Sequence, residues 1–147
     1  MKNIFTVLLM LLMGSLPAWA ALGENVSSVD SDAQALGAQH VMVAKVGYNM
    51  HQITLRDGSV IKEFVSPAGT VFGVSWRSHS MPNLPQLLGS YLTNLQLGQR
   101  TRVIPRRGVT IQGNDFVFTN FGLTGSFHGR AWVPSLVPAN LTMEVVQ

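Results

Sequence analysis

Four histidines are the side chains best suited to acid–base or metal chemistry. They are His40, His51, His79 and His128. The sequence contains no H-E-x-x-H motif and no pair of histidines four residues apart on a predicted helix, so a metal site would need ligands from distant parts of the chain. We therefore predict no metal and no cofactor.

His51 and His128 nevertheless offer one catalytic arrangement. His51 starts a predicted strand and His128 lies in a glycine-flanked segment, so the two could approach each other across a sheet. Together with Arg130 and a carboxylate such as Asp115, they would form the centre of a small hydrolase or a metal-dependent enzyme. This alternative depends on whether the four side chains converge.

Other catalytic signatures are absent from the sequence. It has no G-x-S-x-G nucleophile motif and no G-x-x-x-x-G-K-[ST] phosphate loop. It also has no cysteine, which excludes thiol catalysis and zinc–cysteine sites. The sequence thus favours a non-catalytic protein.

The residues that could hold a ligand or partner are mostly basic. They are Arg100, Arg102, Arg106, Arg107, His128 and Arg130. The first four fall within eight residues, and guanidinium groups so close together could bind carboxylates or phosphates, including those of lipopolysaccharide. Basic loops are also often simply solvated, and both interpretations remain open.

The overall charge is low. Charged residues make up 12% of the chain, about half the ~25% of an average soluble protein. Nucleic-acid binding normally requires a strong basic stripe, so we expect no nucleic-acid partner.

The first twenty residues have the features of a secretory signal peptide. Lys2 precedes an apolar run over residues 4–13, and Ala18 and Ala20 are the small residues expected before a cleavage site. The run is too short to span a bilayer, which takes about 20 residues. We predict cleavage after Ala20, leaving one exported domain over residues 21–147 without a transmembrane segment.

The mature chain begins with a weak helix signal and continues as strands. Asp32 and its neighbours predict a short helix over residues 32–37. Residues 41–43 form a short apolar run, and residues 52–76 alternate in hydrophobicity as an antiparallel three-stranded meander does. Asp57-Gly58 predicts a two-residue turn with positive φ at both positions, and Ser66-Pro67-Ala68-Gly69 predicts a second tight reversal.

An amphipathic helix is expected next. Asn83 is its candidate N-cap, Pro85 lies in its first turn, and Gly98 is placed to end it. Its polar face carries no charge, which suits either solvent or a docked partner. A second hairpin around Gly113-Asn114 and a further strand over residues 127–133 complete an α+β fold: an antiparallel meander, one helix packed on the sheet and a C-terminal hairpin.

Several segments resemble a known bacterial family. "ALGE", "ITLRDGSVIKEFVSPAGTVFGVSW", "LPQLLGSY" and "FHGRAWVP" occur in this order over nearly the whole mature chain. Together they resemble the exported family catalogued as domain of unknown function 2844. The resemblance implies an exported protein of Gram-negative bacteria and no defined activity, so it assigns no functional residues.

These observations favour a periplasmic or secreted, non-catalytic binding or accessory protein. Its expected partner is an envelope protein or a polyanionic envelope component. A structural subunit of an envelope assembly is a further alternative, beside the enzyme that uses His51 and His128.

Overall fold

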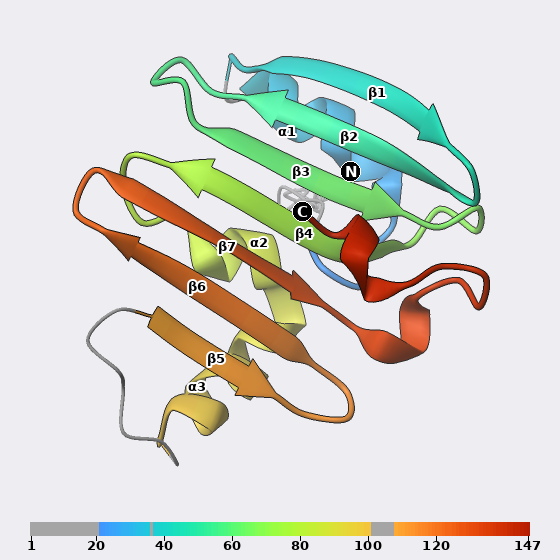
Figure 1. The fold of residues 1–147 in the computed structure, drawn as a ribbon. Coiled ribbons are helices and arrows are strands. Elements are labelled where there is room, and N and C mark those ends of the chain that lie inside the picture. The colour runs from blue at the N-terminus through green and yellow to red at the C-terminus, as the bar shows by residue number, and fades with distance from the viewer. Residues whose placement is uncertain (1–20, 36, 101–107) are drawn as a thin grey trace, which may run out of the picture.

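The computed structural model describes residues 21–35, 37–100 and 108–147. Its strands form one seven-stranded antiparallel sheet, with helices on one face and the C-terminal segment on the other (Figure 1). The helices are α1 (Val29–Ala35), α2 (Leu84–Leu88) and α3 (Leu92–Arg100). The strands are β1 (Gln39–Lys45), β2 (Tyr48–Thr54), β3 (Val60–Val65), β4 (Val71–Ser78), β5 (Gly108–Gln112), β6 (Val117–Leu123) and β7 (Ser126–Trp132). The predicted α+β class is confirmed.

The sheet combines two runs of hairpins. The strand order is β1-β2-β3-β4-β7-β6-β5. The meander predicted over residues 52–76 corresponds to β2, β3 and β4, and β1 adds a fourth strand before it. After β4 the chain passes through α2 and α3 to the far edge, and β7 returns to pair with β4. This last pairing joins the two runs into one sheet.

The β2–β3 turn differs from the two-residue turn expected. Gly58 has φ +82°, but no non-glycine residue in the described chain has positive φ, so Asp57 does not. The N–H of Leu55 donates to the carbonyl of Ser59, and Asp57 Oδ1 accepts from the Ser59 N–H. The connection is therefore a longer turn with one left-handed glycine, closed by the aspartate side chain. The Ser66–Gly69 reversal is confirmed by the Gly69 N–H bond to the Ser66 carbonyl, 2.9 Å.

The helices start and end partly where the sequence indicates. Asn83 caps α2, since its side chain accepts from the Gln86 N–H. Gly98 does not end the helix: α3 continues to Arg100, and a Cβ added at Gly98 would lie 2.7 Å from Ile111 Cγ2 of β5. The first helix begins at Val29, earlier than the predicted Asp32, after a 3₁₀ turn capped by Asn25.

The residues that follow the predicted cleavage site are packed into the core. Leu22 is fully buried, and its N–H donates to the carbonyl of Leu87 in α2. Gly23 and Glu24 exchange backbone hydrogen bonds with Val71 of β4. The "ALGE" segment thus ties α2 to the sheet.

Two apolar clusters lie on opposite sides of the sheet. The larger joins Val29 of α1, Leu88 of α2 and Leu95 of α3 to the helix-covered face. The smaller is built from Phe64, Phe72, Val117, Trp132 and Val146, and the last of these belongs to the C-terminal segment. This segment covers only part of the second face, which leaves the rest of that face open.

No described helix is long and apolar enough to cross a membrane.

Candidate functional site

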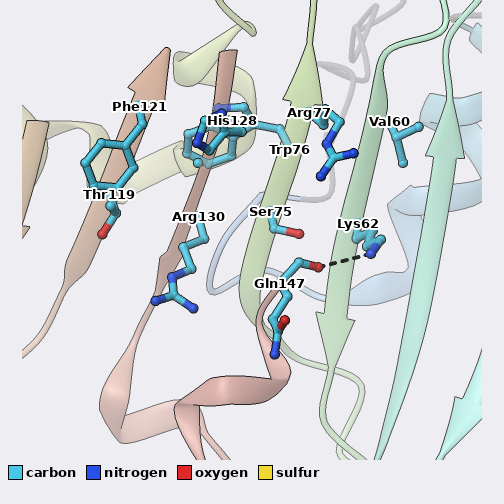
Figure 2. A pocket seen from close by; sticks show the side chains of 11 residues that line it. Val60, Lys62, Ser75, Trp76, Arg77, Thr119, Phe121, His128, Arg130 and Gln147 are labelled. Atoms are coloured by element: carbon cyan, nitrogen blue, oxygen red, sulfur yellow. Dashed lines mark hydrogen bonds between the residues drawn. The ribbon is translucent and has the colours of Figure 1, made fainter. Parts of the chain in front are cut away.

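A hollow of about 540 Å³ lies on the sheet face opposite the helices (Figure 2). We call it the sheet hollow. It is lined by Val60, Lys62, Ser75, Trp76, Arg77, Thr119, Phe121, His128, Gly129, Arg130 and Gln147. These residues come from β3, β4, β6 and β7 and from the end of the C-terminal segment, so the site exists only once the two runs of hairpins have joined.

Strand register explains why these side chains gather. One cross-strand row consists of Val60, Arg77, His128 and Phe121. The next row consists of Lys62, Ser75, Arg130 and Thr119. The rows are two residues apart along each strand, and side chains alternate between faces with a period of two, so both rows share the open face.

The sheet hollow is cationic. Lys62, Arg77 and Arg130 come from the neighbouring strands β3, β4 and β7. Strands are about 4.8 Å apart, so the three backbone positions fall within roughly 10 Å of each other. No Asp or Glu is among the described residues that line the hollow. Its electrostatic potential therefore favours an anion.

Two of the cations are oriented by the C-terminal segment. The Lys62 Nζ donates to the main-chain oxygen of Gln147 at 3.1 Å, as Figure 2 shows. The Arg130 guanidinium donates to the main-chain oxygen of Val146 at 3.2 Å and lies 5.3 Å from the centre of the Trp132 ring. Arg77 is exposed on β4 between these strands. The site thus has two held cations and one that points to solvent.

An aromatic pair stands at the other side of the hollow. The rings of Phe121 and His128 are 6.0 Å apart and tilted by 32°. Phe121 is 42% exposed, which is high for a phenylalanine. The pair adds a flat surface beside the cations, so the hollow can contact both charged and uncharged parts of a ligand.

The predicted binding residues fall partly within this site. His128 and Arg130 line the sheet hollow, as members of adjacent rows. Arg100 is the last residue of α3, on the helix side of the sheet, and its side chain is not described. Arg102, Arg106 and Arg107 lie outside the described residues. Lys62 was missed because it occupies an ordinary polar position of a half-buried strand, and Arg77 was missed because it follows the last residue of the predicted meander.

The proposed catalytic meeting of His51 and His128 does not occur. His51 is buried and lies on the helix-covered face, where its cross-strand row passes through Glu63 and Val74 to Ala131. Ala131 follows Arg130 directly, so the two rows face opposite sides of the sheet. Asp115 lies in the β5–β6 turn, away from both histidines. The enzyme that required these four side chains to converge is therefore ruled out.

His51 instead contacts His40. The His40 Nε2 and His51 Nδ1 are 3.0 Å apart, and the His40 Nδ1 is 2.6 Å from the carboxylate of Asp30 on α1. Burial lowers the pKa of His51, the charge of His40 lowers it further, and Asp30 acts in the opposite direction. The sequence signal for this contact is the alternation of side chains along two adjacent strands. If the chain reverses at Val46-Gly47, His40 and His51 lie on the same face of the sheet.

Among the described residues, no group of three or more His, Asp or Glu side chains is placed to hold a metal ion. Asp30, His40 and His51 form a cluster of polar contacts that links α1 to β1 and β2.

Comparison with known proteins identifies a family and nothing more specific. The family described as "Protein of unknown function (DUF2844)" matches residues 18–146, nearly the whole chain. The chain belongs to this family. No curated protein and no solved structure is detectably similar to it. Because the DUF2844 description states no activity, the function must be argued from the sheet hollow.

Proposed function

We propose that this DUF2844 protein is an exported, non-catalytic binding protein of the bacterial envelope, and that its sheet hollow holds a polyanionic envelope component. The signal-like residues 1–20 support export, and the low charge of the chain suits an extracytoplasmic protein. The observation that carries the proposal is the set of three cations on neighbouring strands in a hollow whose described lining contains no Asp or Glu side chain.

The geometry favours a repeated anion over a single charge. Lys62, Arg77 and Arg130 project from three neighbouring strands, and the C-terminal segment holds Lys62 and Arg130 at separate main-chain oxygens, so a ligand with several anionic groups can engage the three cations together. Phosphates or carboxylates that recur along a polymer would meet each cation in turn. Guanidinium groups bind both kinds of anion through paired hydrogen bonds.

A polymer also fits the hollow better than a folded protein partner. Protein interfaces are held by buried apolar and aromatic anchors. The apolar side chains that line the hollow are Val60, the half-exposed Phe121 and Trp76, and Trp76 is already buried within the protein. An acidic envelope protein is the competing outcome of the test.

The test measures binding of two defined probes, inorganic polyphosphate and polygalacturonate, by titration calorimetry. We expect Arg77→Glu to weaken binding about tenfold, equivalent to ~1.4 kcal/mol, because an attractive charge becomes a repulsive one. Binding by the unmodified protein should weaken as salt rises. A preference for either probe distinguishes phosphate from carboxylate ligands.

Lys45→Glu is the matched control. Lys45 is exposed on the same sheet face, but it lies on the edge strand β1, outside the hollow. Its reversal changes the net charge equally and should leave probe binding nearly unchanged. Equal binding by Arg77→Glu and the unmodified protein, or equal losses in the two variants, would refute a specific site in the hollow.

A further inference from the structure

Strand β1 forms one edge of the sheet, and its outer side is open in the described part of the molecule (Figure 1). One set of its backbone N–H and C=O groups therefore has no strand partner. Val41 is 54% exposed and Met42 is 56% exposed. Such a strand is a template for pairing with another strand.

The usual protections of an edge strand are scarce in β1. Its seven residues, QHVMVAK, include no proline, no glycine and no acidic residue. Lys45 is its one formally charged residue, and it stands at the strand end. Natural edge strands are commonly blocked by prolines, bulges or central charges. The middle of β1, from Val41 to Val43, carries none of these.

We propose that β1 pairs antiparallel with β1 of a second copy of this chain, about a two-fold axis at Met42. This register uses all seven residues. It places Gln39 opposite Lys45, His40 opposite Ala44, Val41 opposite Val43, and Met42 opposite Met42. A two-fold contact of this kind is self-limiting, because each copy offers the same edge to the other.

The sequence of β1 is complementary to itself in this register. Gln39, Val41, Val43 and Lys45 share the open face, as their pairing with β2 shows. On that face Val41 of each copy lies opposite Val43 of the other, so the two pairs form a continuous apolar stripe. At each end of the stripe, Lys45 of one copy lies opposite the neutral Gln39 of the other. Aliphatic cross-strand pairs stabilise a sheet, whereas like charges directly opposite destabilise it, and this register sets no like charges opposite each other.

The helix-covered face is equally compatible with the pairing. The two Met42 side chains meet on the axis, and methionine adapts to an irregular contact. His40 stands opposite the small Ala44, so its contacts with His51 and Asp30 are retained. The joined sheets form one continuous sheet of twice the width, with both sheet hollows on the same side.

The test measures the oligomeric state of the protein by sedimentation velocity over a range of concentrations. The protein is expressed from its full sequence in a bacterial host that can export it, and is purified in the form that the host produces. We expect a concentration-dependent dimer. Val41→Lys/Val43→Lys sets ammonium groups directly opposite each other and should weaken the dimer at least tenfold. Val41→Lys/Val43→Glu sets Lys opposite Glu and should restore it. Val46→Lys, at an 89% exposed residue outside β1, should leave the dimer intact.

A thiol probe tests the register independently of the lysine variants. The chain has no cysteine, so Met42→Cys introduces its single thiol. Directly opposed residues of an antiparallel pair have Cα atoms about 4.5–5.5 Å apart, within disulfide range. Oxidation should therefore link the Met42→Cys chains, while Val46→Cys chains stay unlinked. A monomer at every concentration, or a dimer that Met42→Cys does not link, overturns the proposal, as does an edge occupied only by a different protein.

Discussion

The contact between His40 and His51 joins two ring nitrogens, so the positions of their protons are coupled. One ring nitrogen must donate and the other accept, since the two atoms are 3.0 Å apart. His40 faces the Asp30 carboxylate through Nδ1, so in the tautomer that donates to Asp30 its Nε2 carries no proton and accepts from the Nδ1–H of His51. Glu63 is the cross-strand partner of His51 on β3 and shares its face. Protonating His51 would place a charge in a buried position, which is the main reason that its pKa is lowered.

This arrangement predicts a loss of stability in mild acid. The folded protein lowers the pKa of His51 below its ordinary 6.5, mainly by burial. At this residue the unfolded chain therefore binds more protons, so the contribution of His51 to the free energy of unfolding is present above about pH 6.5 and is lost as the pH falls through the lowered pKa. His51→Asn keeps a side-chain amide that can hydrogen-bond near the Nδ1 position, but it cannot titrate. Urea unfolding at about pH 8 and about pH 5 should show a smaller acid loss in His51→Asn; identical losses would contradict the prediction.

Between elements, close contacts set the spacing of the sheet and its covering helices. Gly98 allows α3 to approach Ile111 of β5, and Gly129 of β7 leaves room for the Trp76 ring. The Trp76 indole N–H donates to the Asn120 side-chain oxygen at 3.1 Å, a buried bond between β4 and β6 across β7. Gly129 thus lies between the two residues that connect the two runs of hairpins.

Gly129→Ala should destabilise the protein by about 1–3 kcal/mol, the usual effect of overpacking. The added Cβ would collide with the Thr119 carbonyl oxygen and the Trp76 ring. Gly113→Ala is the control, since the nearest atom to its added Cβ is the Phe116 carbonyl oxygen at 3.3 Å. Chemical denaturation of both variants measures the difference. A Gly129→Ala protein as stable as Gly113→Ala would show that β6 and β7 can shift to accept the methyl group.

At the scale of the whole molecule, the two sheet faces are covered differently. Helices cover one face, while on the other the C-terminal segment covers only Phe64, Phe72, Trp132 and their neighbours (Figure 1). Val146 is fully buried, and a Cβ at Gly73 of β4 would meet its side chain. The sheet hollow lies in the uncovered remainder of this face.

Val146→Ala should therefore destabilise the whole fold by about 2 kcal/mol, since it removes two buried methyl groups. Val46→Ala makes the same change at a residue that is 89% exposed and should have little effect. Thermal or urea unfolding compares the two variants. If Val146→Ala leaves stability unchanged, the C-terminal segment is not part of the cooperative core.

The sequence by itself determined the local elements of this protein. Period-two alternation located β2, β3 and β4, Asn83 marked the start of α2, and Gly69 marked a reversal, because each signal depends on neighbouring residues alone. Asp57 and Gly98 were misjudged, since the turn length and the approach of Ile111 depend on the packed partner.

Only the tertiary structure decided the site. The pairing of β4 with β7 joins segments about fifty residues apart, and no local pattern fixes the partner or the register. That register sets His128 and Arg130 beside Lys62 and Arg77 and sends His51 to the opposite face. A shift by one residue would exchange the faces, and burial of the apolar side chains beneath the helices excludes that shift.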